Sequence, residues 1–405
     1  MNFRLRIALC LLLAGLAAHS AYSQQFVGEL DRAEAAQILD RAPAKSHVPC
    51  YIEMPFKPSL DFLFRYAAVF YLQCRLGIVV YPGTTWYAVI RITNQLGQSR
   101  LMLEEFDIPK IAPNRQTLLD GPIADLQASM SGGFALGPGR YQVEIVLTDE
   151  HGNTMRKQWK LKLNEYKQEE RIPTALPAGA IAPLIDARWD GALTANGLRV
   201  TVLLHAYSPS LHARIDAGAR AYVLESLASL LSQLPCKSVR LVAFNIDRQQ
   251  VVYQQDNFDA PGFKRLADTL KQLEFATIPY QSLRRYAWAE FLAGLTRQEI
   301  APEQPSDVVI FLGPWGSHTG EEFPDYLFEE LAGNKKHVFY LMDSIPDFSD
   351  AISKVAKAMH GSTYTIYSPQ TLERAIQKMT AQIAIAPVTP GAQSASLESA
   401  TLKTP

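Results

Sequence analysis

The hydrophobic period of this chain changes along its length, and that change limits the folds available to it. Between residues 48 and 165, apolar residues alternate with polar ones in short runs, as in residues 141–147 and 159–163. Alternation on both sides of a Gly/Asn turn is typical of a β-hairpin, and several closely spaced strands of this kind indicate a β-sandwich. We therefore expect an all-β, Ig-like sandwich domain over residues 48–165.

From residue 197 the pattern changes to continuous apolar strands separated by amphipathic helices. Residues 198–204, 308–312 and 338–342 have the composition of strands that are buried on both faces. Apolar residues at helical spacing mark the intervening helices, for example Val223, Leu227, Leu230, Leu231 and Leu234. Strands that alternate with such helices predict a doubly wound, mostly parallel α/β sheet with helices on both faces. We expect this second domain to span residues 197–386.

The remaining segments have the composition of targeting, connecting and tail sequences. Residues 1–23 contain Arg4 and Arg6, a short apolar run and a small-residue cleavage site, which is typical of a secretory signal peptide. The run is short for a membrane span, so we expect cleavage, with an uncleaved anchor as the alternative. Residues 24–47 indicate a polar helical lead-in, residues 166–196 a linker, and residues 387–405 a disordered tail. We expect an exported chain, periplasmic or secreted, without stable membrane insertion after cleavage.

Export affects how the cysteines are interpreted, because an oxidising compartment permits disulfides. Cys10 lies in the leader, whereas Cys50 and Cys74 lie in the same strand-rich region and form the expected pair. Cys236 is then the unpaired thiol, and we expect it to be buried at a helix-to-strand junction. The Cys and His residues do not have the spacing of a zinc site.

The charge balance excludes some classes of partner. The chain has 39 Lys and Arg residues and 40 Asp and Glu residues, so its formal charge is −1. Binding to nucleic acid requires a concentrated basic surface, and we therefore expect no nucleic-acid partner. With 48% hydrophobic and 20% charged residues, the chain can bury a sizeable core. Fibrous, collagenous and polybasic proteins are excluded, but composition does not define an activity.

The segment after the first strand of the second domain resembles a known family. The apolar strand at 198–204 is followed by Ala-Tyr-Ser-Pro-Ser at 206–210. This x-x-Ser-x-Ser segment is similar to the von Willebrand factor type A (vWA) family, which has Asp-x-Ser-x-Ser there and binds a divalent ion. A β-sandwich with a Gly-x-Tyr strand, here Gly139 and Tyr141, further resembles the exported "VWFA-related" proteins of acidobacteria. The resemblance implies a vWA-like fold and a role in adhesion or scaffolding.

The ion-binding positions depart from the pattern of that family. Ser208 and Ser210 match its two serines, but Ala206 occupies the position of its aspartate. The strand at 308–312 is followed by Gly-Pro-Trp, where the family usually has Thr-Asp-Gly or Ser-Asp-Gly. Magnesium in proteins usually takes one or two carboxylate ligands. We therefore expect a degenerate metal-ion-dependent adhesion site, with no bound metal and no cofactor.

A vWA-like domain without its ion implies a non-enzymatic module that binds a protein partner, which the sequence does not identify. Large rigid side chains are suitable anchors because they bury a large area at little entropic cost. Those expected on the rim of the sheet are Tyr207, Pro209, Ile278, Tyr280 and Trp315. One alternative is a structural envelope protein that self-assembles into a homo-oligomer. In another, the domain keeps the ion with ligands supplied by the partner.

A serine hydrolase is the less favoured alternative. Ser208 follows a strand, and Asp343 and His360 complete the chain order Ser, Asp, His. A nucleophile elbow normally needs glycine on both sides of the serine, and here Pro209 removes a backbone N–H that would stabilise the oxyanion. We therefore expect no enzymatic activity from this chain.

Overall fold

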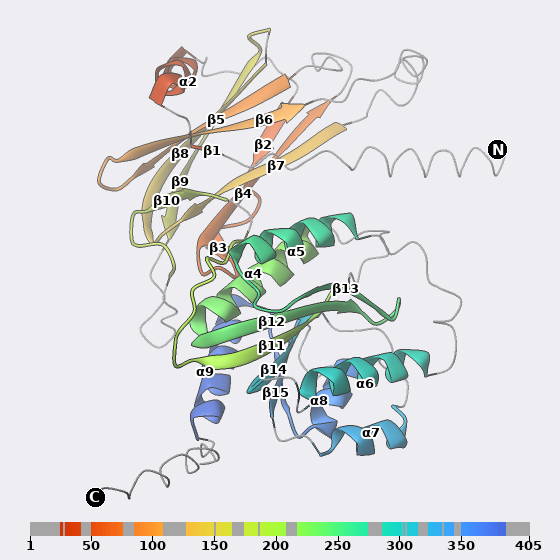
Figure 1. Cartoon of the computed structure of the whole chain (residues 1–405). Coiled ribbons are helices and arrows are strands. Elements are labelled where there is room, and N and C mark those ends of the chain that lie inside the picture. The colour runs from red at the N-terminus through yellow and green to blue at the C-terminus, as the bar shows by residue number, and fades with distance from the viewer. Residues whose placement is uncertain are drawn as a thin grey trace, which may run out of the picture. The chain divides into compact units, whose positions relative to one another are not determined.

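The computed structural model describes residues 25–26, 29–41, 50–75, 85–107, 127–149, 151–163, 174–184, 187–207, 217–273, 286–301, 303, 306–314, 323–333, 336–343 and 350–385. The chain divides into two units, Met1–Ala187 and Arg188–Pro405, which are described separately (Figure 1). Among the described residues, no helix is long and apolar enough to cross a membrane.

The first unit contains two antiparallel sheets. The five-stranded sheet has the order β1-β6-β5-β8-β9, with β1 (Gln25–Phe26), β6 (Ser99–Asp107), β5 (Thr85–Asn94), β8 (Gly139–Asp149) and β9 (Thr154–Leu163). The other sheet has the order β10-β7-β4-β2, with β10 (Ile181–Pro183), β7 (Gln127–Leu136), β4 (Tyr66–Arg75) and β2 (Cys50–Glu53). The short strand β3 (Ser59–Leu60) pairs with β4.

The two sheets share one hydrophobic core. Alternate residues of β5 and β4 supply much of it: Trp86, Ala88, Ile90, Ile92, Tyr66, Ala68, Phe70 and Leu72. Burial at every second position is the pattern of a strand with one face on the core. The prediction of a β-sandwich is therefore confirmed.

The helix α2 (Glu29–Arg41) covers part of the outer face of the five-stranded sheet. Ala35 and Leu39 of this helix cluster with Val89 of β5 and Val146 of β8. Both valines lie on the face opposite the main core, since the side chains of a strand alternate between its faces. Helix α2 therefore removes from water apolar residues that the sandwich itself does not cover.

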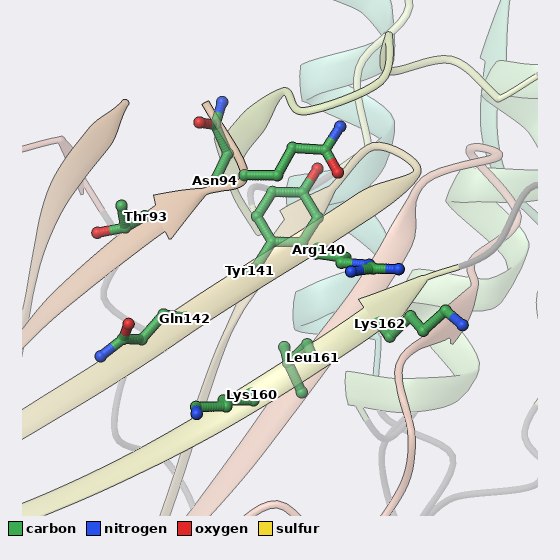
Figure 2. Close-up of a pocket in the computed structure, with 9 residues that line it drawn as sticks. Thr93, Asn94, Arg140, Tyr141, Gln142, Lys160, Leu161 and Lys162 are labelled. Carbon is green, nitrogen blue, oxygen red and sulfur yellow. The ribbon is translucent and has the colours of Figure 1, made fainter. Parts of the chain in front are cut away.

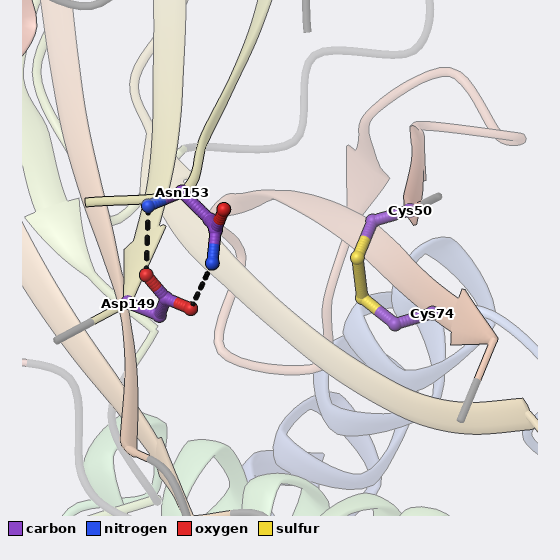
Figure 3. The surroundings of a disulfide bond; sticks show 4 residues. All are labelled: Cys50, Cys74, Asp149 and Asn153. Atoms are coloured by element: carbon purple, nitrogen blue, oxygen red, sulfur yellow. Dashed lines mark hydrogen bonds between the residues drawn. A yellow bond between two sulfur atoms is a disulfide. The ribbon is translucent and has the colours of Figure 1, made fainter. Parts of the chain in front are cut away.

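The β8–β9 hairpin is closed by the side chain of Asp149. Its Oδ1 accepts hydrogen bonds from the backbone N–H of His151 at 3.0 Å and of Asn153 at 2.8 Å. Its Oδ2 accepts a bond from Asn153 Nδ2 at 2.7 Å (Figure 3). Gly152 has φ +78°, a conformation that glycine adopts without steric cost. These residues form the turn that the sequence predicted between the two strands.

A disulfide joins Cys50 of β2 to Cys74 of β4, two residues that lie directly opposite each other in the sheet (Figure 3). The bond closes a loop with a sequence separation of 24 residues. Such a loop restricts the unfolded chain and stabilises the folded state by on the order of 3 kcal/mol. Because β2 is a short edge strand, the disulfide fastens the end of the sheet where few backbone bonds are available.

Cys236 is a free, buried thiol.

Part of the segment expected to be a linker belongs to the sandwich unit. Residues 181–183 form β10, which pairs with β7. The Tyr141 hydroxyl donates to Gly137 O at 2.8 Å and lies 3.2 Å from Ala180 O. Asn94 Nδ2 donates to Gly179 O at 2.9 Å. The sequence of this segment shows no strand pattern, because side chains distant in sequence hold it in place.

The second unit is built on a six-stranded sheet with the order β13-β12-β11-β14-β15-β16. Its strands are β13 (Gln250–Gln255), β12 (Cys236–Asn245), β11 (Leu198–His205), β14 (Val308–Pro314), β15 (His337–Asp343) and β16 (Ser362–Thr365). All neighbouring strands are parallel except β13, which is antiparallel to β12.

Helices cover both faces of this sheet (Figure 1). One face, with Leu203, Phe311 and Tyr340, packs against α6 (Ala287–Ile300), α7 (Asp325–Leu331) and α8 (Ala351–Ala358). The other face is covered by α4 (Ala217–Gln233), α5 (Ala260–Gln272) and α9 (Pro369–Ile385). The prediction of a doubly wound, mostly parallel α/β sheet is confirmed.

We predict that Tyr141→Phe destabilises the sandwich unit by about 1–3 kcal/mol, because it removes the hydroxyl that donates to Gly137 O. Tyr51→Phe is the matched control, since the Tyr51 side chain is 53% exposed. Urea denaturation of both variants checks this expectation. Equal unfolding free energies for the two variants would show that the Tyr141 hydroxyl does not fasten the 174–184 segment.

Candidate functional site

The order of strands defines where a ligand site is expected in the α/β unit. The chain leaves β11 toward β12 on one side and later continues through β14 and β15 on the other. In open α/β sheets, ligands bind at this switch point, beyond the carboxyl ends of the strands. We use the name carboxyl edge for the ends of four neighbouring strands, at His205, Asn245, Pro314 and Asp343. The two strands at the switch point are β11 and β14.

A hydrogen bond of His205 joins those two strands. Nδ1 of His205 lies 3.0 Å from the carbonyl oxygen of Pro314. Because a carbonyl only accepts, Nδ1 carries the proton. The side chain is fully buried, and its Nε2 has no hydrogen-bond partner among the described residues. Burial lowers the pKa of His205, while the bond to Pro314 O and the charge of Asp350 raise it, with a lowered pKa as the net result.

Aromatic rings enclose the imidazole of His205. The ring of Tyr207 stacks on it with a centroid separation of 5.4 Å and an interplanar angle of 6°. The ring of Phe244 lies at 5.3 Å in a tilted arrangement. On β14, Gly313 has φ +145°, and a Cβ there would lie 2.7 Å from His205 O. Only glycine allows the two strands to approach this closely.

Ala206, at the position of the family's aspartate, is enclosed by β12. Its side chain is buried, and its N–H donates to Phe244 O at 2.8 Å. Its carbonyl accepts from Asn245 Nδ2 at 2.8 Å, and Asn245 Oδ1 accepts from Arg248 N at 2.8 Å. The polar contacts of this position therefore come from its own backbone.

Several residues singled out from the sequence lie outside the described residues: Ser208, Pro209, Ser210, Ile278, Tyr280 and Trp315. Their roles stay predictions. Within the described ranges, the structure contains no group of three or more His, Cys, Asp or Glu side chains that could hold a metal ion. Of the expected rim residues, the structure thus places Tyr207.

A second polar cluster lies beside this site, on β15 and α8. Asp350 is fully buried and caps α8, with Oδ1 accepting from Ser353 N at 2.8 Å. Its Oδ2 accepts from the Tyr340 hydroxyl at 2.9 Å. Burial, followed by the charge of Asp350, raises the pKa of Tyr340 well above its ordinary value. Tyr340 therefore remains protonated and serves as a buried donor.

Asp343, at the carboxyl end of β15, has an unusual proton affinity. Burial raises its pKa from 3.8 to about 6, against a smaller lowering by a hydrogen bond with Tyr222. The Tyr222 hydroxyl also lies 2.7 Å from Ile366 O. The cost of burying the carboxylate therefore outweighs the hydrogen bond with Tyr222.

Two aromatic residues near the carboxyl edge were not found from the sequence. Tyr326 lies in the first turn of α7, the crossover helix after β14, and is 52% exposed. Tyr367 lies just beyond the end of β16 and is 57% exposed. Their positions after strand ends were a usable signal, but their exposure depends on packing that the sequence does not show.

The structure separates two residues of the hydrolase alternative. Asp343 ends β15, whereas His360 precedes Ser362 of β16, which pairs with Phe339 near the start of β15. The four-residue length of strand between these levels corresponds to about 13 Å. Asp343 and His360 therefore lie toward opposite ends of the sheet, which argues against an assembled triad.

Comparisons with known proteins do not assign the chain to a family. No protein-family model matches it, and no curated protein matches it. A von Willebrand factor type A structure from Catenulispora acidiphila is 12% identical over 61% of this chain and 46% of that chain, with a TM-score of 0.27. The PilB minor pilin from Streptococcus sanguinis is 10% identical over 87% of this chain and 96% of that chain, with a TM-score of 0.26. Similarities at this level support no argument, so the fold class rests on the sheets and cores described above.

We predict that Asp343→Asn stabilises the protein increasingly as the pH rises from about 4 to above 6. A pKa raised from 3.8 to about 6 means that the folded state favours the protonated carboxyl. That stabilisation is complete below pH 3.8 and is lost as the pH rises through about 6, whereas asparagine stays neutral throughout. Each kcal/mol recovered raises Tm by about 2–4 °C.

Thermal melts of wild type and Asp343→Asn across this pH range measure the difference. Asp325→Asn, at an exposed position in the first turn of α7, serves as the control. A stability difference that is independent of pH, or that falls as the pH rises, would contradict the raised pKa of Asp343.

Proposed function

We propose that this protein is an exported, non-enzymatic interaction module whose vWA-like α/β unit binds a protein partner without a bridging metal ion. The hydrogen bond from His205 to Pro314 O is the observation that carries the proposal. It joins β11 and β14 with a neutral side chain at the switch point, where the resembled family holds its ion. Binding there then depends on side chains around the edge instead of on a metal.

The chemistry of the described residues supports an ion-free edge. A divalent cation needs oxygen ligands with negative charge to compensate for the water that it loses. The methyl group of Ala206 offers no ligand, and the lowered pKa of His205 favours an uncharged imidazole. Asp350 already accepts bonds from Tyr340 and from the first turn of α8.

The aromatic residues of the edge are suitable anchors for a protein surface. Tyr207 is held by its stacking on the buried His205, so little conformational entropy is lost when a partner binds. Tyr326 and Tyr367 add exposed aromatic area. Pro209, Ile278, Tyr280 and Trp315 complete the proposed surface from the sequence prediction.

The Cys50–Cys74 disulfide supports the proposal of an exported protein. Disulfides persist in oxidising compartments and are rare where thiols are kept reduced. Together with the leader-like residues 1–23, the bond favours a periplasmic or secreted location.

Self-assembly into an envelope structure is the second candidate function. It is favoured by exposed aromatic residues on and near the edge strand β2, with Tyr51 at 53% and Phe56 at 72% exposure. Edge strands with exposed apolar residues can pair with another chain. This candidate predicts a concentration-dependent increase in mass for the purified protein, whereas the proposed function predicts a partner of different sequence.

The test is capture of proteins from an envelope extract of the source cells by the immobilised mature protein. We expect the same captured protein in EDTA and in Mg²⁺, a loss of capture with Tyr207→Ala, and retention with Tyr207→Phe. Loss of one anchor residue typically weakens binding by about 2 kcal/mol or more, roughly thirtyfold. Leu193→Ala, an exposed apolar residue before β11, is the matched control at the opposite end of the sheet.

Capture that requires Mg²⁺ would contradict the metal-free mechanism. Capture that is equal for wild type and Tyr207→Ala would contradict the proposed surface. A captured protein identical to the bait would instead support self-assembly.

A further inference from the structure

The sandwich unit contains a pocket of about 470 Å³ where β5 and β9 end and β8 begins (Figure 2). This volume lies within the range of about 300–1,000 Å³ that is usual for small-molecule sites. Three cationic side chains line the pocket, namely Arg140 of β8 and Lys160 and Lys162 of β9. It is distinct from the carboxyl edge, because it belongs to the other unit of the chain.

The strand register places these cations beside one another. Arg140 lies directly opposite Lys162, and Lys160 lies opposite Gln142, which in turn faces Thr93 of β5. Alternation along the strands puts all five positions on the outer face of the sheet. Like charges directly opposite each other destabilise an antiparallel pair. The Arg140–Lys162 pair is therefore unfavourable for the fold unless an anion lies between the two.

Among the described residues of this face, Glu144 of β8 is an acid that is already paired. Glu144 Oε2 accepts from Arg91 at 2.6 Å, and Glu144 Oε1 accepts from Arg156 and from Gln158 at 2.8 Å. Although burial acts to raise the pKa of Glu144, the bonds from Arg91, Gln158 and Arg156 hold it below the ordinary value. In the described part of the chain, no ion pair involves Arg140, Lys160 or Lys162.

The wall of the pocket is rigid. The polar atoms of Tyr141 and Asn94 are used within the unit, where they bond to Gly137 O and Gly179 O. Burial raises the pKa of Tyr141 to about 12, so its hydroxyl stays protonated at neutral pH. These two side chains hold the three strand ends in place. The groups with capacity for a ligand are the cations, the Gln142 amide and the Thr93 hydroxyl, which already shares one hydrogen bond with Ser99 Oγ at 2.7 Å.

We propose that this pocket binds an acidic saccharide, with its carboxylate or sulfate group between Arg140 and Lys162 and its hydroxyls on Gln142 and Thr93. The cations supply charge-assisted hydrogen bonds, and the amide and hydroxyl suit a ligand rich in hydroxyl groups. A single strand of nucleic acid fits less well, because the aromatic ring in the lining, Tyr141, is only 3% exposed and offers no stacking platform.

Titration calorimetry of the mature protein with a short oligogalacturonate tests the proposal. We expect binding that weakens with added salt, and no binding of a neutral cello-oligosaccharide of equal length. Arg140→Gln and Lys162→Gln should each weaken binding about tenfold through the loss of a charge-assisted bond. Lys157→Gln is the matched control, since Lys157 is exposed on the same strand but belongs to the opposite face.

Thermal melts without ligand separate binding from folding. Lys162→Gln relieves the repulsion with Arg140, so its Tm should equal or exceed that of wild type. The proposal is overturned if oligogalacturonate does not bind at low salt, or if Lys162→Gln binds as well as wild type. Equal affinity for sodium sulfate alone would also overturn it, because that result would describe an oxyanion site and not a saccharide site.

Discussion

The hydrogen bond between His205 Nδ1 and Pro314 O is the interaction that organises the carboxyl edge of the α/β unit. It joins the two strands that flank the switch point, and it holds a fully buried imidazole there. Burial favours the neutral ring, and the close approach of the strands requires glycine at position 313. Tyr207 stacks on the ring, so an aromatic side chain is fixed beyond the strand ends. Among the described residues, an uncharged ring and an aromatic side chain therefore lie where such folds usually admit a ligand.

In the sandwich unit, other interactions stabilise the edges of the sheets and the ends of their strands. The disulfide at Cys50 and Cys74 fastens the short edge strand β2. The other sheet ends at β9, where lysines discourage pairing with a second chain. Tyr141 and Asn94 hold the segment at 174–184 against the strand ends. Paired charges surround Glu144, while Arg140 and Lys162 remain opposite each other. The charges around Glu144 therefore form a structural network, whereas Arg140 and Lys162 belong to the surface that we propose as a ligand site.

Both fold classes followed from periodicity, because the alternation in 141–147 and the apolar run at 198–204 are local properties of the chain. The same holds for the turn at 149–153. The role of His205 was not predictable, since its partner Pro314 lies 109 residues away and is set by strand order. Strand β10 was missed because distant side chains position it. The opposition of Arg140 and Lys162 depends on register, which composition does not reveal.

The most direct measurement of the central claim is a thermal melt of the mature protein in EDTA and with increasing Mg²⁺, Mn²⁺ or Ca²⁺. An ion that binds only the folded state adds about 2.7 kcal/mol of stability at a hundredfold excess over Kd. With the switch point joined by His205 and Ala206 in the aspartate position, we expect no shift in Tm at millimolar metal. A saturable shift that is lost in Ser208→Ala would contradict this account and would establish a functional metal site at the carboxyl edge.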